Sequence, residues 1–171
     1  DSLSPGFRSD VGVENYRRIL NNPQITGPFL RVLRWNFVWA TLSVVTTFAL
    51  GLFLAILLND PTLRFRYLYR TLLVVPYAVP GFISVLVWRG LLNTDFGVIN
   101  RILSAFFGAG IPWFESVFWA KFAVIGVNLW LGFPYMMIIC LGALQSIPPN
   151  LYSVADIDGA SRPRQFTSIT L

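Results

Sequence analysis

The sequence predicts an all-α, polytopic membrane protein fragment with three transmembrane helices. Its 171 residues are 55% hydrophobic and 12% charged, and that charged share is about half of the ~25% found in a typical soluble domain. Three apolar runs are long enough to cross a bilayer, which takes about 17 to 25 residues: 35–58, 71–88 and 122–144. An amphipathic segment between the second and third runs predicts an interfacial helix, and a short helix is predicted after the third run.

The composition excludes several kinds of chemistry. There is no histidine, and the single cysteine, Cys140, lies inside an apolar run, so His-based catalysis and nearly all zinc sites are excluded. The only lysine, Lys121, is not part of a phosphate-binding loop, so any ATP would bind to another chain. We expect no catalytic residue, no metal and no cofactor. Because the chain starts at Asp1 without a methionine, we also expect it to be a fragment.

The net charge of +5 comes almost wholly from arginines scattered between the apolar runs. This pattern is typical of charges that flank membrane spans, so we expect membrane lipid and no nucleic acid as a partner. The short connector after the first run and the C-terminal tail carry arginines, which favours a cytoplasmic location for both. The N-terminal arginines oppose this assignment, so charge alone leaves the orientation open.

Prolines shape the first two predicted spans. Pro28 is suited to the first turn of a helix, and Asn59-Asp60-Pro61 is expected to stop the first span. Pro76 and Pro80 predict a kink in the second span. That kink either serves packing alone or marks a break that lines a pathway.

The third span, 122–144, contains Asn128 and Pro134. A polar amide inside a span is a candidate functional group, because an unpaired polar group is costly in lipid. The alternative is a hydrogen bond between helices.

The segment 98–107 has apolar residues at helical spacing, with Asn100, Arg101 and Ser104 on the opposite face and Gly108 as its expected end. Ile111-Pro112-Trp113-Phe114 is expected to be an aromatic anchor at the membrane interface. Before the first span, a short helix is predicted near 13–20 within a flanking segment, 1–27. The remainder, 28–171, is expected to form the membrane domain.

The short helix after the third span begins near Asn150 and ends at Gly159, where a left-handed or closely packed conformation is expected. With Asn150 as N-cap, Ser153 occupies the capping-box position at which a glutamate would reach back. Isolated helices of this length are marginal in water, so this helix is expected to need a docking surface.

These segments carry a family resemblance. Leu151-Tyr152-Ser153-Val154-Ala155-Asp156-Ile157-Asp158-Gly159-Ala160 resembles the coupling loop of binding-protein-dependent ABC importer permeases. The strings 73–80, with 82–84, and 96–100 are similar to those of carbohydrate permeases, and Trp130-Leu131-Gly132-Phe133-Pro134-Tyr135-Met136-Met137 is most like the larger membrane subunit of maltose/maltodextrin transporters. The resemblance covers most of the chain from about Pro28 onward. It departs at Ser153 and Val154, where the family usually has glutamate and alanine, and at Leu171, where the family continues into further spans.

The resemblance implies a multi-pass permease subunit in the inner (plasma) membrane, forming half of the pathway of an ATP-driven carbohydrate importer, of the maltose/maltodextrin type. It implies four kinds of partner: a second homologous permease subunit, two cytoplasmic ATPase subunits, an extracytoplasmic sugar-binding protein and membrane lipid. The chain itself would not be an enzyme. The loop 148–162 would be cytoplasmic and would hold the short coupling helix, and the segment 1–27 would be extracytoplasmic.

The resemblance also assigns site residues. The residues that would contact the ATPase are Leu151, Val154, Ala155, Asp158, Gly159 and Ala160. The residues that would contact sugar are Asn128, Leu131, Gly132 and Tyr135. Sugar binding needs an amide for hydroxyl groups, a glycine for close approach and an aromatic ring for the apolar sugar face. Three alternatives stay open: a permease for another small solute, a non-transporting assembly subunit, and a membrane-embedded enzyme, which the absence of paired carboxylates or histidines in the spans disfavours.

Overall fold

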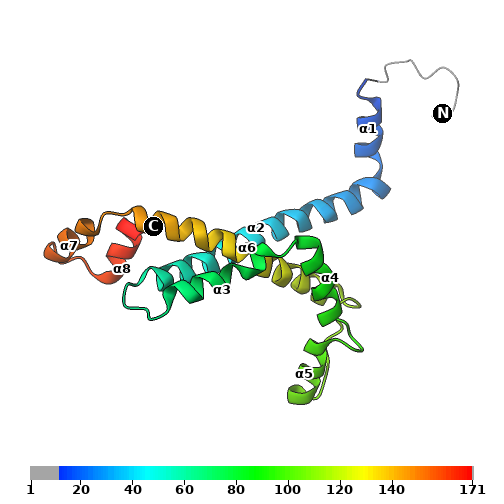
Figure 1. Ribbon diagram of the computed structural model, residues 1–171. Coiled ribbons are helices and arrows are strands. Elements are labelled where there is room, and N and C mark those ends of the chain that lie inside the picture. The colour runs from blue at the N-terminus through cyan, green and yellow to red at the C-terminus, as the bar shows by residue number, and fades with distance from the viewer. Residues whose placement is uncertain (1–11, 171) are drawn as a thin grey trace. The chain divides into compact units, whose positions relative to one another are not determined.

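The computed structural model describes residues 12–170, and the regular secondary structure in this part of the chain is all helical, with no strand, which confirms the predicted all-α class (Figure 1). The elements are α1 (Glu14–Asn21), α2 (Pro23–Asn59), α3 (Arg66–Ala78), α4 (Gly81–Leu91), α5 (Val98–Phe107), α6 (Val117–Ser146), α7 (Pro149–Ile157), α8 (Arg162–Gln165) and the π-helical turn η1 (Phe166–Thr170). The chain divides into two compact units, one ending at Thr41 and one beginning at Leu42. Residues 1–11 of the predicted flanking segment lie outside the described residues.

The first unit contains α1, which confirms the predicted short helix, and the beginning of α2. Helix α2 starts at Pro23, so the prediction that Pro28 lies in its first turn is wrong. The reason is that Asn22 caps the helix, its side-chain oxygen accepting the Gln24 N–H at 3.0 Å. Pro23 then occupies the first position, where a missing N–H costs nothing. Pro28 is an interior proline that removes one hydrogen bond from the ladder.

In the second unit, α2 packs against α6 through small side chains spaced four residues apart. Ser43, Thr47, Gly51 and Ala55 are all buried. A Cβ atom added at Gly51 would lie 2.7 Å from Met136 Cβ and 2.8 Å from the Met137 backbone nitrogen, so the two backbones approach closely. Small residues at this spacing are typical of helix pairs in membranes, where close packing replaces the hydrophobic driving force.

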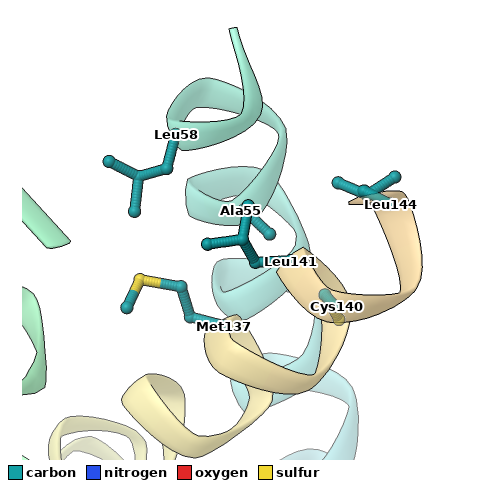
Figure 2. Close-up of a cluster of buried hydrophobic side chains, with 6 residues drawn as sticks. All are labelled: Ala55, Leu58, Met137, Cys140, Leu141 and Leu144. Carbon is teal, nitrogen blue, oxygen red and sulfur yellow. The ribbon is translucent and has the colours of Figure 1, made fainter. Parts of the chain in front are cut away.

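Beyond this contact the two helices share an apolar core (Figure 2). Figure 2 shows its six buried residues, Ala55 and Leu58 from α2 and Met137, Cys140, Leu141 and Leu144 from α6. Ala55 and Met137 are fully buried, at 0% exposure. Leu73 and Val74 of α3 pack against the same core. Three segments far apart in the sequence are therefore held together at this point.

Two helices are long and apolar enough to cross a membrane, α2 and α6, in agreement with the first and third predicted runs. Helix α2 ends at Asn59 as predicted. In the connector that follows, Asp60 accepts hydrogen bonds from the Thr62 hydroxyl at 2.7 Å and the Thr62 N–H at 2.8 Å. These bonds, the hydroxyl first, hold the pKa of the Asp60 carboxyl below its usual value.

The second predicted run is divided into two helices. Helices α3 and α4 are bent by 91° at a short break, so the kink predicted in the second run takes the form of a full interruption of the helix. Val79 is extended, at φ −83° and ψ 128°, because a residue before proline is disfavoured in the helical region. Pro80 is the N-cap of α4, and its carbonyl accepts the first hydrogen bonds of that helix, from Ile83 and Ser84. Counted together, α3 and α4 are a third candidate span.

The contact between α2 and α6 leads to a stability prediction. Replacing Gly51 with alanine forces the two helices apart, because the added Cβ meets backbone atoms, and we expect a loss of about 1–3 kcal/mol. The measurement is the temperature at which the detergent-solubilised protein loses its monodisperse state. The matched control is Gly142→Ala in α6, where an added Cβ meets nothing within 4 Å. An equal effect of both substitutions would contradict the prediction.

Candidate translocation and coupling sites

The four predicted sugar-contact residues all lie in α6. Asn128 and Tyr135 are seven residues apart, which is about two helical turns, so they share one face. Asn128, Leu131 and Gly132 are half-buried, and Tyr135 is 50% exposed. Within residues 12–170 the Asn128 side chain makes no hydrogen bond. The alternative of a bond between helices thus finds no partner in the described part of this chain.

Gly132 has a second role that the sequence did not predict. A Cβ atom added there would lie 2.9 Å from Thr47 Cγ2, so Gly132 allows α2 to approach α6. We expected Gly132 to allow close approach of a sugar, whereas in the structure it allows close approach of helix α2. This contact places the stripe of predicted residues directly beside the seam between α2 and α6.

Tyr77, in the last turn of α3, joins this region and was missed in the sequence. Its ring stacks with that of Tyr135, with ring centroids 6.2 Å apart and an angle of 22° between the planes. Both tyrosines are at least half exposed, 56% for Tyr77 and 50% for Tyr135. The position of Tyr77 directly after Pro76, just before the break in the second run, could have indicated its role. The pair offers ring faces and two hydroxyl groups about two turns from Asn128, on the same face of α6.

Helix α7 has the predicted glycine stop. Gly159 is left-handed, at φ +72°. Its N–H donates to the Asp156 carbonyl at 3.1 Å, and the Ala160 N–H donates to the Ala155 carbonyl at 2.9 Å. These two bonds form a Schellman motif. An added Cβ at Gly159 would meet nothing within 4 Å, so backbone conformation rather than crowding requires glycine.

The start of α7 differs from the prediction. The helix begins at Pro149 with Pro148 as N-cap, so Asn150 is not the cap and Ser153 is not in a capping-box position. Proline is favoured at the first helical position because its φ already suits the helix. Any effect of Ser153, where the resemblance leads us to expect a glutamate, therefore does not act through a capping box.

One side of α7 is apolar and exposed. Leu151, Val154 and Ile157 are 46%, 54% and 85% exposed. Ile157 was missed in the sequence, although its spacing of three from Val154 was a usable signal. Of the other predicted coupling residues, Asp158 and Gly159 are exposed, whereas Ala155 and Ala160 are half-buried. Leu151, Val154 and Ile157 thus form an exposed apolar edge on α7.

Helix α5 and its left-handed end at Gly108 are confirmed, but the position of its polar face is not as predicted. Val98, Ile102, Phe106 and Phe107, from the predicted apolar face, are all more than half exposed. Asn100, by contrast, is buried, at 4% exposure. The assignment of Asn100 to an open polar face is therefore wrong.

Asn100 is buried because its amide uses every hydrogen-bonding position. Its Nδ2 donates to the carbonyls of Thr94 at 3.0 Å and Ile111 at 2.9 Å. Its Oδ1 accepts the Ile111 N–H at 3.1 Å and the Trp113 Nε1–H at 2.9 Å. Trp113 is 7% exposed and packs with Leu92 and Ala123, so it is not an aromatic anchor in the membrane interface. Asn100 instead ties together the two ends of the connector that holds α5.

Two long apolar helices and a further apolar helix pair bent at a short break define a helical membrane protein. The chain matches the family model described as "Binding-protein-dependent transport system inner membrane component" over residues 47–171. This chain belongs to that family, and it is a multi-pass inner-membrane protein.

The chain is similar to curated members of the family. It is 44% identical over 171 residues to the maltose/maltodextrin transport system permease protein MalF of Vibrio vulnificus (strain YJ016), a match that covers 100% of this chain and 33% of the relative. The identity to MalF of Escherichia coli (strain K12) is also 44%, with the same coverage. The chain thus spans about one third of the length of these relatives.

Two solved structures share the fold. One is the crystal structure of a bacterial ABC transporter involved in the import of the acidic polysaccharide alginate, with a TM-score of 0.81, 24% identity, and coverage of 96% of this chain and 57% of that chain. The other is the bacterial alginate ABC transporter in complex with an alginate pentasaccharide-bound periplasmic protein. Its TM-score is 0.76 and its identity 25%, and the match covers 94% of this chain and 55% of that chain.

The buried amide of Asn100 gives a prediction on local stability. In Asn100→Ala the Trp113 Nε1–H and the backbone groups of Ile111 lose their partners, at a cost of about 1–3 kcal/mol for each buried group. We expect residues 94–113 to exchange amide hydrogens faster, measured by mass spectrometry. Ser104→Ala on the same helix is the control, because the Ser104 side chain is exposed. Unchanged exchange in Asn100→Ala would contradict the prediction.

Proposed function

We propose that this chain is part of a permease subunit of an ATP-driven importer and contributes to half of a translocation pathway for a carbohydrate, maltose or maltodextrin. The observation that carries the proposal is the 44% identity to MalF over all 171 residues. The match covers the whole chain, including the segments that hold the candidate sugar and coupling residues. ATP hydrolysis belongs to partner subunits in this proposal.

The proposed topology has three spans, α2, the broken pair α3–α4, and α6. The segment 1–27 is the extracytoplasmic flank, and 28–171 is part of the permease membrane domain. With α7 in the cytoplasm, the connector that holds α5 lies on the outer side, where its exposed phenylalanines seat in lipid. A broken span is tolerated in a membrane where its free backbone groups line a cavity or meet protein, which supports placing the α3–α4 break beside the pathway.

The proposed sugar site is the stripe of Asn128, Leu131, Gly132 and Tyr135 on α6, joined by Tyr77. Asn128 offers an amide that has no side-chain partner within residues 12–170. The stacked rings of Tyr77 and Tyr135 offer the apolar surface that a sugar ring covers, together with hydroxyl groups. Gly132 keeps α2 close beside this stripe. A few polar groups on an apolar wall are typical of small-molecule sites.

The proposed coupling site is the loop 148–162, in which α7 docks against a cytoplasmic ATPase subunit. The contact residues are Leu151, Val154, Ala155, Asp158, Gly159 and Ala160, with Ile157 added from the structure. The complete machine in this proposal has a second homologous permease subunit, two ATPase subunits and an extracytoplasmic sugar-binding protein. The exposed apolar edge of α7 supports this docking, because a protein partner would cover it.

A permease for another saccharide is the second candidate. The fold similarity to the alginate transporter supports it, since a shared fold accommodates different solutes. Competition of uptake by unlabelled maltodextrin and by an acidic oligosaccharide separates the two candidates. The first requires inhibition by maltodextrin alone.

The sugar site is tested with Asn128→Ala in the full-length permease, assembled with its partners in proteoliposomes. Loss of one hydrogen bond of about 1 kcal/mol lowers uptake roughly fivefold. Assembly and basal ATP hydrolysis should persist. Gln145→Ala is the matched control, because it removes an exposed amide from the same helix outside the stripe. If Asn128→Ala assembles poorly but the assembled fraction transports normally, Asn128 serves helix packing and the site is wrong.

The coupling loop is tested by comparing two glycines with the same backbone conformation. Gly159 at φ +72° and Gly108 at φ +74° both have open space where a side chain would go. Valine at either position incurs a left-handed strain of about 1–2 kcal/mol. We expect Gly159→Val alone to lower the solute transported per ATP hydrolysed. Equal ratios in Gly159→Val and Gly108→Val would contradict the coupling role.

A further inference from the structure

A buried side-chain amide connects α7 to the helical segment that follows it. Gln165 lies at the end of α8 and is 4% exposed. Its Nε2 donates to Asp156 Oδ1 in α7 at 2.6 Å and to the carbonyl of Ala160 at 3.0 Å. One amide nitrogen thus joins α7, the left-handed turn and α8, which lie together in Figure 1. The charged acceptor makes the bond to Asp156 stronger than one between neutral groups.

A second contact joins the same two segments at another point. The hydroxyl groups of Tyr152 in α7 and Thr170 in η1 are 3.0 Å apart and share a hydrogen bond. Tyr152 and Asp156 are four residues apart, so they lie on one face of α7. Two points of attachment on one face fix both the position and the rotation of a helix, whereas one would leave it free to swing.

The exposed apolar edge lies on the other side of α7. Around the helix, Val154 is roughly half a turn away from Tyr152 and Asp156, and Ile157 is about a third of a turn away from them. Val154 and Ile157 are 54% and 85% exposed, whereas Tyr152 is half-buried and Asp156 is exposed but hydrogen-bonded to Gln165. The helix therefore has one face attached to its own chain and one face available to a partner.

We propose that Gln165 is a positioning residue that, with Tyr152 and Thr170, makes α7, α8 and η1 one rigid element. A push on the exposed edge of α7 then moves the segment from Arg162 to Thr170 as a unit. Without the Gln165 contact, the turn at Gly159 would act as a hinge and absorb the displacement. This proposal rests on the coupling role proposed above for the loop 148–162. It concerns transmission within this chain and assigns no partner contact to Gln165.

The test uses Gln165→Glu in the full-length permease, assembled with its partners in proteoliposomes. The new carboxylate faces Asp156, and the two repel each other instead of bonding. We expect the solute transported per ATP hydrolysed to fall roughly fivefold, the lower end of typical coupling factors between sites. Ser168→Glu is the control, because it adds the same charge to an exposed position of η1 and should leave the ratio unchanged.

A double variant that exchanges the acceptor at position 156 and the donor at position 165 tests whether coupling can be restored. In Asp156→Asn with Gln165→Glu the donor moves to position 156 and the acceptor to position 165, so the bond between them can form again. We expect the ratio to recover in large part, although the bond to the Ala160 carbonyl stays lost. Asp156→Asn alone keeps an acceptor for Gln165 and should be close to the original protein. A normal ratio in Gln165→Glu, or no recovery in the double variant, would overturn the proposal.

Tyr152→Phe is the second variant, for the case in which Gln165→Glu does not assemble. It removes only the hydroxyl that meets Thr170, and we expect a smaller fall in the same ratio. A normal ratio in Tyr152→Phe would then overturn the proposal.

The Gly159→Val variant separates this proposal from the coupling role on which it rests. If Gly159→Val uncouples and Gln165→Glu does not, the loop couples but the Gln165 contact does not transmit. If neither uncouples, the coupling role itself is wrong.

Discussion

The arrangement of the second unit depends on the close packing of α2 against α6. Within lipid, apolar surface gains little by leaving one hydrocarbon environment for another, so two helices stay together through close contact of their atoms. Here the contact is made by Thr47 against Gly132 and by Gly51 against the backbone of Met136 and Met137. Helix α6 carries Asn128 and Tyr135, and α7 follows it after a short connection. The contact between α2 and α6 therefore helps to determine the position of both proposed sites. A larger side chain at Gly51 or Gly132 would displace α6 and everything that it carries.

Two asparagines show how the surroundings of an amide decide its role. Asn100 and Asn128 have the same side chain, and both lie in apolar segments. Asn100 makes four hydrogen bonds within the connector and needs nothing else, so its role is structural. Asn128 makes no side-chain hydrogen bond within residues 12–170, although it is half-buried. An amide in this position needs water, a solute hydroxyl or another subunit as its partner, and the proposed translocation pathway would offer each of these.

The sequence was informative where local chemistry decides the structure. Long uncharged runs predicted α2 and α6, and Gly108 and Gly159 were correctly expected to end helices, because only glycine adopts left-handed backbone at little cost. It was less informative where two residues compete for one role. Helix α2 begins at Pro23 rather than near Pro28, because the Asn22 side chain caps it with a hydrogen bond. Helix α7 begins at Pro149, although Asn150 was also suited to the start of a helix. The burial of Asn100 could not be predicted, because its partners at Ile111 and Trp113 belong to the connector beyond α5.

The shape of the loop after α6 is determined by this chain before any partner binds. The Schellman motif at Gly159 ends α7, and Gln165 and Thr170 hold its inner face. A nine-residue helix that had to fold on docking would lose conformational entropy at that step, and this loss would weaken binding. A preformed α7 avoids most of that loss and presents Leu151, Val154 and Ile157 in a fixed pattern. Rigidity also determines what a partner can do, since a displacement passes through an element only if the element does not bend. In the proposed coupling, affinity for the ATPase partner and transmission of its movement would thus depend on the same few hydrogen bonds.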